Sequence, residues 1–294
     1  MPEFEKVAQV LPSEREMNMR LSSFRIGLGG FGLGMLGTGA AMAQALEKVG
    51  VPVPGGMGFQ PAVTEGARDL QFLDHMLNII SLGIVVLVTV LLAYAALRFN
   101  SRANPKPATF THNSPLEVAW TIVPIVILVF IGSFSLPALF RSQEIPVADI
   151  TLKVTGNQWF WSYEYPDEGV SFDSFMLERE ELAANGYADS DYLLATDTAV
   201  VLPVGKTIVV DVTGSDVIHG WQVPAFGIQH AAVPGRLGQL WFNADKEGIY
   251  FGQCNALCGK DHSYMPIVVK IVSQEAYAKW LEAAKAGDVI LAQN

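Results

Sequence analysis

Two long uncharged stretches constrain this chain more than any other feature of its sequence. Residues 76–97 form an apolar run of 22 residues without a charge, and residues 118–140 form a second run of 23. At about 1.5 Å per helical residue, each run would be about 33 Å long, close to the hydrocarbon thickness of a bilayer. The sequence therefore predicts a transmembrane hairpin over residues 71–142, with helices at about 74–98 and 117–140.

The loop between the two runs indicates how the hairpin is oriented. It carries Arg98, Arg102 and Lys106, and no acidic residue occurs before Glu117. Basic loops stay preferentially in the cytoplasm. The expected location is therefore a bacterial inner membrane, crossed more than once. The soluble part and both ends of the mature chain would lie in the periplasm, with membrane lipid around the helices.

Residues 1–43 have the pattern of an export signal. Basic residues precede an uncharged stretch that ends in small residues, so cleavage is expected after Ala43 or Ala45. A further membrane anchor is the alternative, but seven glycines among residues 26–43 lower both helicity and hydrophobicity. Residues 44–70 would then form an irregular periplasmic segment ahead of the hairpin.

The pattern changes after the second run to short β-branched and aromatic segments separated by Gly, Pro, Asn and Asp. Such spacing predicts a β-sandwich or barrel over residues 143–273. Ser273 would cap a closing amphipathic helix within residues 274–294, in which Glu275 and Lys279 are one turn apart. The predicted strands cover residues 150–154, 159–165, 199–204, 207–212, 237–242 and 267–272.

Charge restricts the partners of the soluble part. The whole chain has 29 acidic and 19 basic residues, and residues 148–273 alone hold 16 acidic against 7 basic ones. Such a surface could not neutralise a run of phosphates, so a nucleic-acid partner is not expected. A solvated acidic surface is the simplest explanation of the bias, and attraction of a basic protein is the functional one.

A short segment near the C-terminus combines the ligand types of a copper site. The only two cysteines, Cys254 and Cys258, are followed by His262 and Met265 in the pattern C-x3-C-x3-H-x2-M, and His219 lies 35 residues upstream of Cys254. Thiolate, imidazole and thioether together suit copper that cycles between Cu(I) and Cu(II). A mononuclear blue-copper site needs one cysteine, whereas two thiolates can bridge two ions.

Three other readings of these residues compete with copper. An oxidising compartment permits a disulfide between the cysteines. Zinc accepts two cysteines and two histidines in a tetrahedron but makes no use of Met265. Met265 could also simply be a core residue. The histidine and methionine at set spacing favour copper over the disulfide and over zinc.

Four segments together resemble cytochrome c oxidase subunit II, over about residues 70–280. In that family the exported domain is a cupredoxin holding a dinuclear copper A centre. The resemblance implies a mixed fold, a two-helix transmembrane hairpin followed by a cupredoxin-like β-barrel or sandwich. The segments are the cysteine loop at 254–265, DVIHGW at 216–221, VPGR at 233–236 and QWFWSYEY at 158–165.

The resemblance also implies a set of copper ligands. Two cysteines would bridge two copper ions, two histidines would be terminal ligands, and one thioether and one backbone carbonyl would be axial. In that order they are Cys254 and Cys258, His219 and His262, Met265, and the carbonyl of Ala256.

The implied activity is that of an electron-transfer subunit in a proton-translocating oxidoreductase. Electrons from cytochrome c would pass through the copper pair to haem in subunit I, where oxygen is reduced, so the chain would not be catalytic alone. By resemblance Trp159 receives the electrons, and Glu164, Asp197 and Asp216 dock cytochrome c. Glu117 would lie at the mouth of a proton channel that enters subunit I.

Two positions depart from the family pattern. Most relatives have a glutamate at the position of Ala256 and an aspartate at that of Ala231. In the family the glutamate helps hold a magnesium ion at the boundary with subunit I, so a weakened or absent magnesium site is expected in this chain.

Rival functions are a copper carrier or assembly factor, a quinol oxidase subunit without copper, and a nitrous oxide reductase, which is soluble and has a large additional domain.

Overall fold

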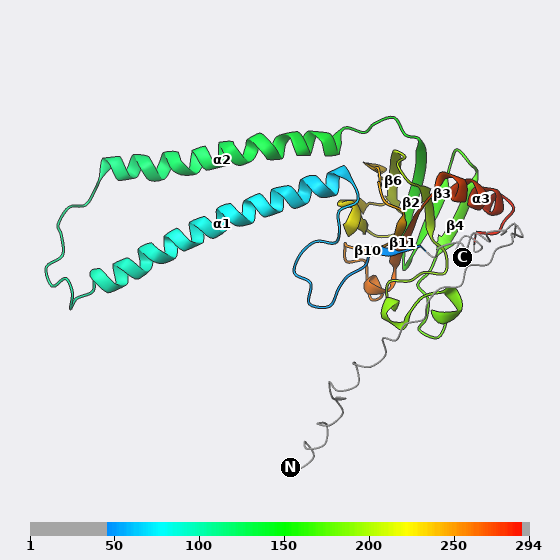
Figure 1. Cartoon of the computed structure of the whole chain (residues 1–294), viewed down its shortest axis with the longest axis horizontal. Helices are drawn as coiled ribbons and strands as arrows, with labels where there is room; N and C mark the ends of the chain where they lie inside the picture. Colours follow the sequence, from blue (N-terminus) through cyan, green and yellow to red (C-terminus); the bar gives the residue numbers. More distant parts are fainter. Residues whose placement is uncertain (1–45, 290–294) are drawn as a thin grey trace, which may run out of the picture. The chain divides into compact units, whose positions relative to one another are not determined.

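The computed structural model describes residues 46–289, so the proposed signal segment and its cleavage sites lie outside the described residues. Two helices come first, α1 (Glu65–Arg98) and α2 (Ser114–Gln143). Both are long and apolar enough to cross a membrane, and they run alongside each other in Figure 1. The chain thus has the hairpin that its uncharged runs predict.

Helix α1 begins 11 residues before its uncharged run at residue 76, and α2 begins four residues before its run at residue 118, because a polar side chain caps each helix. The Thr64 hydroxyl accepts a hydrogen bond from Ala67 N at 2.9 Å, and the Asn113 side chain accepts one from Leu116 N at 3.2 Å. Such caps satisfy amides that would otherwise have no partner in the first turn. Helix α1 therefore starts at Glu65 rather than near residue 74.

The remaining chain forms two packed β-sheets. One sheet has the order β5-β11-β10-β7-β8, with β1 added on β10, and the other has the order β4-β3-β2-β6-β9. This is the sandwich expected from the sequence. The first sheet comprises β5 (Val200–Pro203), β11 (Pro266–Val272), β10 (Gly248–Cys254), β7 (His219–Val223), β8 (Ile228–Ala232) and β1 (Lys48–Gly50). The second comprises β4 (Val170–Ser174), β3 (Phe160–Tyr165), β2 (Ile150–Asn157), β6 (Ile208–Gly214) and β9 (Gly238–Phe242).

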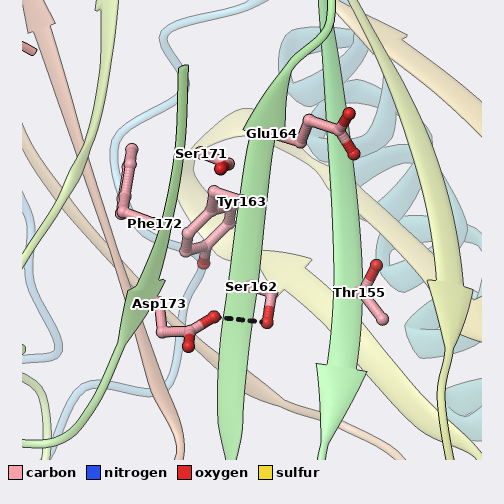
Figure 2. Close-up of a pocket in the computed structure, with 7 residues that line it drawn as sticks. All are labelled: Thr155, Ser162, Tyr163, Glu164, Ser171, Phe172 and Asp173. Carbon is pink, nitrogen blue, oxygen red and sulfur yellow. Dashed lines mark hydrogen bonds between the residues drawn. The ribbon is translucent and has the colours of Figure 1, made fainter. Parts of the chain in front are cut away.

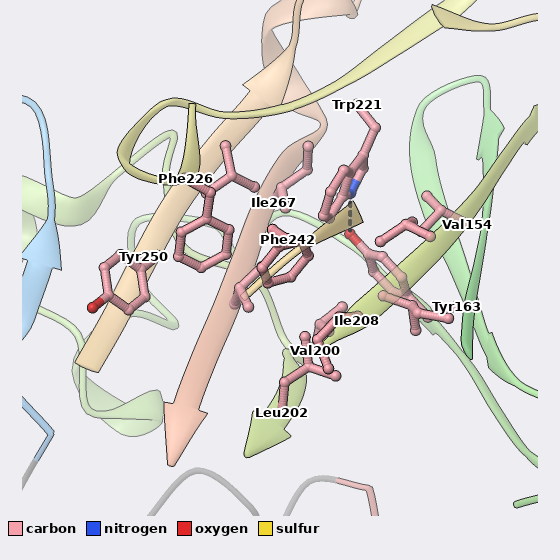
Figure 3. Packing of buried hydrophobic residues seen from close by; sticks show 14 of the residues in the cluster. Val154, Tyr163, Val200, Leu202, Ile208, Trp221, Phe226, Phe242, Tyr250 and Ile267 are labelled. Atoms are coloured by element: carbon pink, nitrogen blue, oxygen red, sulfur yellow. Dashed lines mark hydrogen bonds between the residues drawn. The ribbon is translucent and has the colours of Figure 1, made fainter. Parts of the chain in front are cut away.

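Large aromatic side chains fill the space between the sheets. Trp161 and Tyr163 alternate along β3 and are fully buried, as is Trp221 on β7. Figure 3 shows the Trp221 indole directed at the Tyr163 hydroxyl, to which its Nε1 donates a hydrogen bond of 3.4 Å. Aromatic side chains bury large apolar areas, so this cluster stabilises the packing of the two sheets against each other. Its Trp161 ring contacts His219, the first residue of β7.

All six predicted strands are present, but β1, β4, β7, β8 and β10 were not predicted. The reason is clearest for β7 and β10, in which nearly every residue is buried. A strand covered on both faces has no polar alternation, and glycines interrupt both of these sequences, so the period-two signal disappears.

A third helix and the edge strand β1 complete the fold. Helix α3 (Gln274–Lys285) closes the chain. Its predicted cap is confirmed, since the Ser273 hydroxyl accepts a hydrogen bond from Ala276 N at 3.2 Å. Near the start of the described chain, β1 pairs in parallel with β10, and Lys48 forms an ion pair with the buried carboxylate of Asp191. The segment ahead of the hairpin is therefore partly a strand, rather than irregular throughout.

Candidate metal centre

Strand pairing brings the distant histidine to the cysteine loop. His219 opens β7 and Cys254 ends β10. These strands are antiparallel neighbours in which Cys254 is paired with Trp221. The loop after Cys254 then returns through a short 3-10 turn at His262–Tyr264 into β11. Ligands that are far apart in the sequence thus meet at one end of one sheet.

Three ligand atoms form a compact cluster. A nitrogen of His219 and the sulfurs of Cys254 and Cys258 lie within 4.8 Å of one another, and all three residues are buried. The two sulfurs are 3.8 Å apart, too far for a disulfide bond of about 2.05 Å. The Cys258 sulfur is also 3.6 Å from His262 Nδ1 and 3.5 Å from Met265 Sδ.

The backbone of the loop contributes to the same cluster. The carbonyl oxygen of Ala256 lies 3.3 Å from the Cys254 sulfur. All six atoms that the resemblance names as ligands are therefore gathered about the two thiols. Met265 is 1% exposed, so it is buried as a core residue would be, and its sulfur nevertheless faces a thiol.

The His219 ring offers a nitrogen suited to a metal ion. Its Nε2 lies 2.8 Å from Asp216 Oδ1, and because an ionised carboxylate only accepts hydrogen bonds, Nε2 carries the proton. Nδ1 then has a free lone pair. It is buried and has no hydrogen-bond partner among the described residues. Buried polar atoms are rarely left unpaired, so Nδ1 fits a metal-bound nitrogen oriented by a carboxylate on the other side of the ring.

Electrostatics favour a bound cation at the two thiols. Burial, and then the neighbouring Cys254, raise the pKa of Cys258 to about 12. A thiolate is therefore costly here without a positive charge beside it. A metal ion supplies that charge and displaces the thiol protons. Two thiols, two imidazoles, a thioether and a carbonyl form a donor set that fits copper.

Two residues that shape the site were not singled out from the sequence. Gly156 on β2 lies against the His219 ring, and a Cβ there would be 2.8 Å from His219 Cγ. Trp161 donates its Nε1–H to the Met265 carbonyl at 3.1 Å, and its ring centroid is 6.0 Å from that of His219. No local pattern marks either role, because both arise from packing across the sandwich.

The structure brings Trp159 against the cysteine loop. A Cβ on Gly259 would lie 2.9 Å from Trp159 Cζ2, and Gly259 has φ of 131°, so both the close contact and the backbone favour glycine. The neighbouring Gln158 donates its side-chain amide to the Cys258 carbonyl at 2.9 Å. Trp159 is half-buried and packs on the core, so only part of its indole is open to a partner.

The three predicted docking acids all make contacts within the chain. Glu164 is one of the residues that line the pocket shown in Figure 2, and it pairs with Lys153 at 2.8 Å. Asp197 accepts hydrogen bonds from Phe175 N and Thr198 N, each at 2.8 Å. Burial raises the Asp197 pKa, and these hydrogen bonds oppose the rise only in part.

Asp216 differs from the other two acids because it contacts a predicted metal ligand. Besides His219, it accepts hydrogen bonds from Val217 N at 2.6 Å and Gln158 N at 2.8 Å. Partial burial acts to raise its pKa, but these hydrogen bonds outweigh burial, and the pKa is lowered. The carboxylate therefore stays ionised and connects the His219 segment to the Trp159 segment.

Glu117 has a clear local partner. It lies in the first turn of α2, and its carboxylate accepts a hydrogen bond from Asn113 N at 3.0 Å. Asn113 in turn accepts one from Leu116 N, so the two residues form a reciprocal N-terminal cap. This arrangement explains Glu117 structurally, and its role in proton uptake stays a prediction.

Comparison with known proteins identifies the family. The family model for the periplasmic domain of cytochrome c oxidase subunit II matches residues 150–272, and the model for its transmembrane domain matches residues 52–138. Cytochrome c oxidase subunit 2 of Cereibacter sphaeroides is 55% identical over 285 residues, which cover 92% of this chain and 94% of that protein. The probable subunit 2 of Rickettsia bellii (strain RML369-C) is 42% identical over 78% of this chain and 84% of its own.

A solved structure is also similar. The crystal structure of the periplasmic domain of subunit II of cytochrome oxidase (CoxB) of Bradyrhizobium japonicum is 46% identical, covers 49% of this chain and 99% of its own, and superposes with a TM-score of 0.45. With both family models matched in chain order on the hairpin and the sandwich, the chain belongs to the cytochrome c oxidase subunit II family.

Proposed function

We propose that this subunit receives electrons from cytochrome c at a dinuclear copper A centre and passes them to haem in subunit I, where oxygen is reduced. One observation carries the proposal. The buried Nδ1 of His219, which has no hydrogen-bond partner among the described residues, lies beside two thiols that follow 35 and 39 residues later in the sequence. A chain that needed only a stable core would not assemble unsatisfied donors of this kind.

The residues that would hold copper are the six named by resemblance. When bound, copper would supply reversible one-electron chemistry. Around it, the chain excludes water, since Cys254 is 6% and Cys258 4% exposed. Asp216 holds the His219 ring through Nε2, and Trp161 fixes the backbone at Met265. These contacts limit movement of the ligands, which is what a rapid electron carrier requires.

Trp159 is the proposed receiving residue, because its indole touches Gly259, which directly follows Cys258. Glu164, Asp197 and Asp216 would attract a basic cytochrome c. Asp197 and Asp216 are engaged in backbone hydrogen bonds, so their charges are fixed in position. Docking acids of this type chiefly raise the association rate and its dependence on salt.

The membrane part completes the proposal. The two spans fit an inner-membrane protein, and the basic loop between them favours a periplasmic soluble domain and periplasmic mature termini. Cleavage after Ala43 or Ala45 would leave a short segment before β1. Glu117, at the cytoplasmic end of α2, would be the entrance of a proton path into subunit I.

The test is copper loading of the full chain in detergent. The metal-free, reduced protein should bind two copper ions per chain. Its electron paramagnetic resonance spectrum should show hyperfine structure from one unpaired electron shared by two copper nuclei. Binding of a single ion, or a spectrum localised on one Cu(II), would refute the dinuclear centre.

A copper carrier remains the rival function, and burial of the thiols opposes it. A protein that hands copper on needs ligands that a recipient can reach, whereas both cysteines here are almost fully covered. Slow loss of copper to an external chelator, over hours, is the behaviour expected of a resident centre.

The proposed complex has a weakened magnesium site. The Ala256 carbonyl faces Cys254, but its methyl side chain gives no hard oxygen ligand, which magnesium requires. Cells grown with excess manganese should yield an oxidase without a tightly held manganese resonance from this position, and Ala256→Glu should create or strengthen that signal. A stoichiometric signal in the unaltered protein, with a ligand from this subunit, would contradict the proposal.

A further inference from the structure

A lysine covers the face of the proposed receiving residue. Lys260 Nζ lies 5.5 Å from the centroid of the Trp159 ring. An ammonium group over an indole face is attracted by the negative electrostatic potential of that face, which the quadrupole of the neutral ring produces. The Lys260 side chain is 78% exposed, so the charge lies at the surface that a docking protein would meet.

Two contacts favour this position. Asp261 pairs with Lys260 at 3.2 Å, and Gly259, the residue before Lys260, packs against Trp159. The indole is held in turn by packing, since its buried Nε1 has no hydrogen-bond partner among the described residues. Lys260 and Trp159 therefore form one unit at the edge of the cysteine loop.

The charge of Lys260 opposes that of the surrounding domain. Residues 148–273 carry 16 acidic and 7 basic side chains, yet a basic one lies over the ring itself. A donor approaching Trp159 thus meets the positive end of the Lys260–Asp261 pair at the ring, on a domain whose net charge is negative. Near the ring this charge repels a cationic donor and attracts an anionic one.

We propose that Lys260 is a specificity-determining residue that selects electron donors by their charge at Trp159. Lys260 repels the positive residues of a basic donor from the ring, so that they bind the docking acids Glu164, Asp197 and Asp216. A neutral or anionic part of the donor surface then contacts the Trp159 ring. The inference rests on the proposed function, because it takes Trp159 as the receiving residue.

Two small reductants of opposite charge test this in the complete oxidase. Hexaammineruthenium(II), with charge 2+, and iron(II)–EDTA, with charge 2−, each give one electron to the copper centre and become Ru(III) and Fe(III), without proton transfer. At low ionic strength, Lys260→Met should make reduction by the ruthenium complex about fivefold faster and reduction by the iron complex about fivefold slower. This is roughly the factor for a unit charge about 8 Å from a divalent probe in water. Both changes should shrink in about 0.5 M salt.

A second measurement needs no metal. In the metal-free full chain, the Trp159 fluorescence is the part of the signal that Trp159→Phe removes. Lys260→Met should decrease quenching of that part by iodide and increase quenching by caesium. Lys260→Arg should behave like the unaltered chain in both experiments, and Lys279→Met, which removes an exposed lysine on α3, is the matched control.

The outcomes separate this inference from the proposed function. If the unaltered oxidase is reduced by both probes and Lys260→Met changes the rates no more than Lys279→Met does, the role of Lys260 is refuted and the copper centre stands. If neither probe reduces a copper centre, the proposed function fails. The quenching experiment still decides whether the charge of Lys260 controls the access of ions to Trp159.

Discussion

Replacing Trp159 by phenylalanine is expected to lower the turnover of the oxidase with cytochrome c on the order of 100-fold while leaving the KM nearly unchanged. The indole contacts Gly259 beside Cys258, and the smaller phenyl ring shortens the conjugated surface that joins a donor to the copper loop. Binding of cytochrome c would depend mainly on the docking acids Glu164, Asp197 and Asp216, so its affinity should persist. Steady-state kinetics at several ionic strengths would measure both quantities.

Trp241→Phe is the matched control for this substitution. Trp241 is also half-buried, but it lies on β9, where its Nε1 donates to the Arg141 carbonyl at 3.3 Å. Turnover should stay within about twofold of the unaltered value, as for most surface substitutions away from a site. Normal turnover by Trp159→Phe would show that electrons arrive by another route.

Replacing Cys258 by serine is expected to abolish the shared-electron signal and with it electron transfer to subunit I. The Cys258 sulfur is the most connected donor of the cluster, with Cys254, His262 and Met265 all within 3.8 Å. A serine hydroxyl stays protonated at neutral pH and is a poor bridging ligand. Copper analysis and paramagnetic resonance of the purified chain would show at most a localised Cu(II) spectrum.

Leu257→Ala provides the comparison for the cysteine substitution. Leu257 lies between the two cysteines, but its side chain is 83% exposed and supplies no ligand atom. Two copper ions and the shared signal should be retained. Persistence of the shared signal in Cys258→Ser would instead mean that the thiol does not bridge, and the copper assignment would have to be revised.

Local features of this protein could be predicted from the sequence because they depend on neighbouring residues. The membrane hairpin follows from two uncharged runs of membrane length, and the Ser273 cap follows from one polar residue before an amphipathic segment. The types of ligand follow from the chemistry of cysteine, histidine and methionine at short spacing. The buried strands β7 and β10 were missed because burial on both faces removes polar alternation.

Only the tertiary structure decided how these residues work together. Pairing of β10 with β7 brings His219 to Cys254, and packing of the second sheet places Gly156 against the His219 ring. The same long-range contacts bring the backbone of Gln158 to Asp216, the partner of His219, and they bring Lys260 over Trp159. Such contacts join residues tens to about a hundred positions apart. They depend on strand order and on the close approach of two sheets. Neither can be deduced from the spacing of residues along a short segment of the chain.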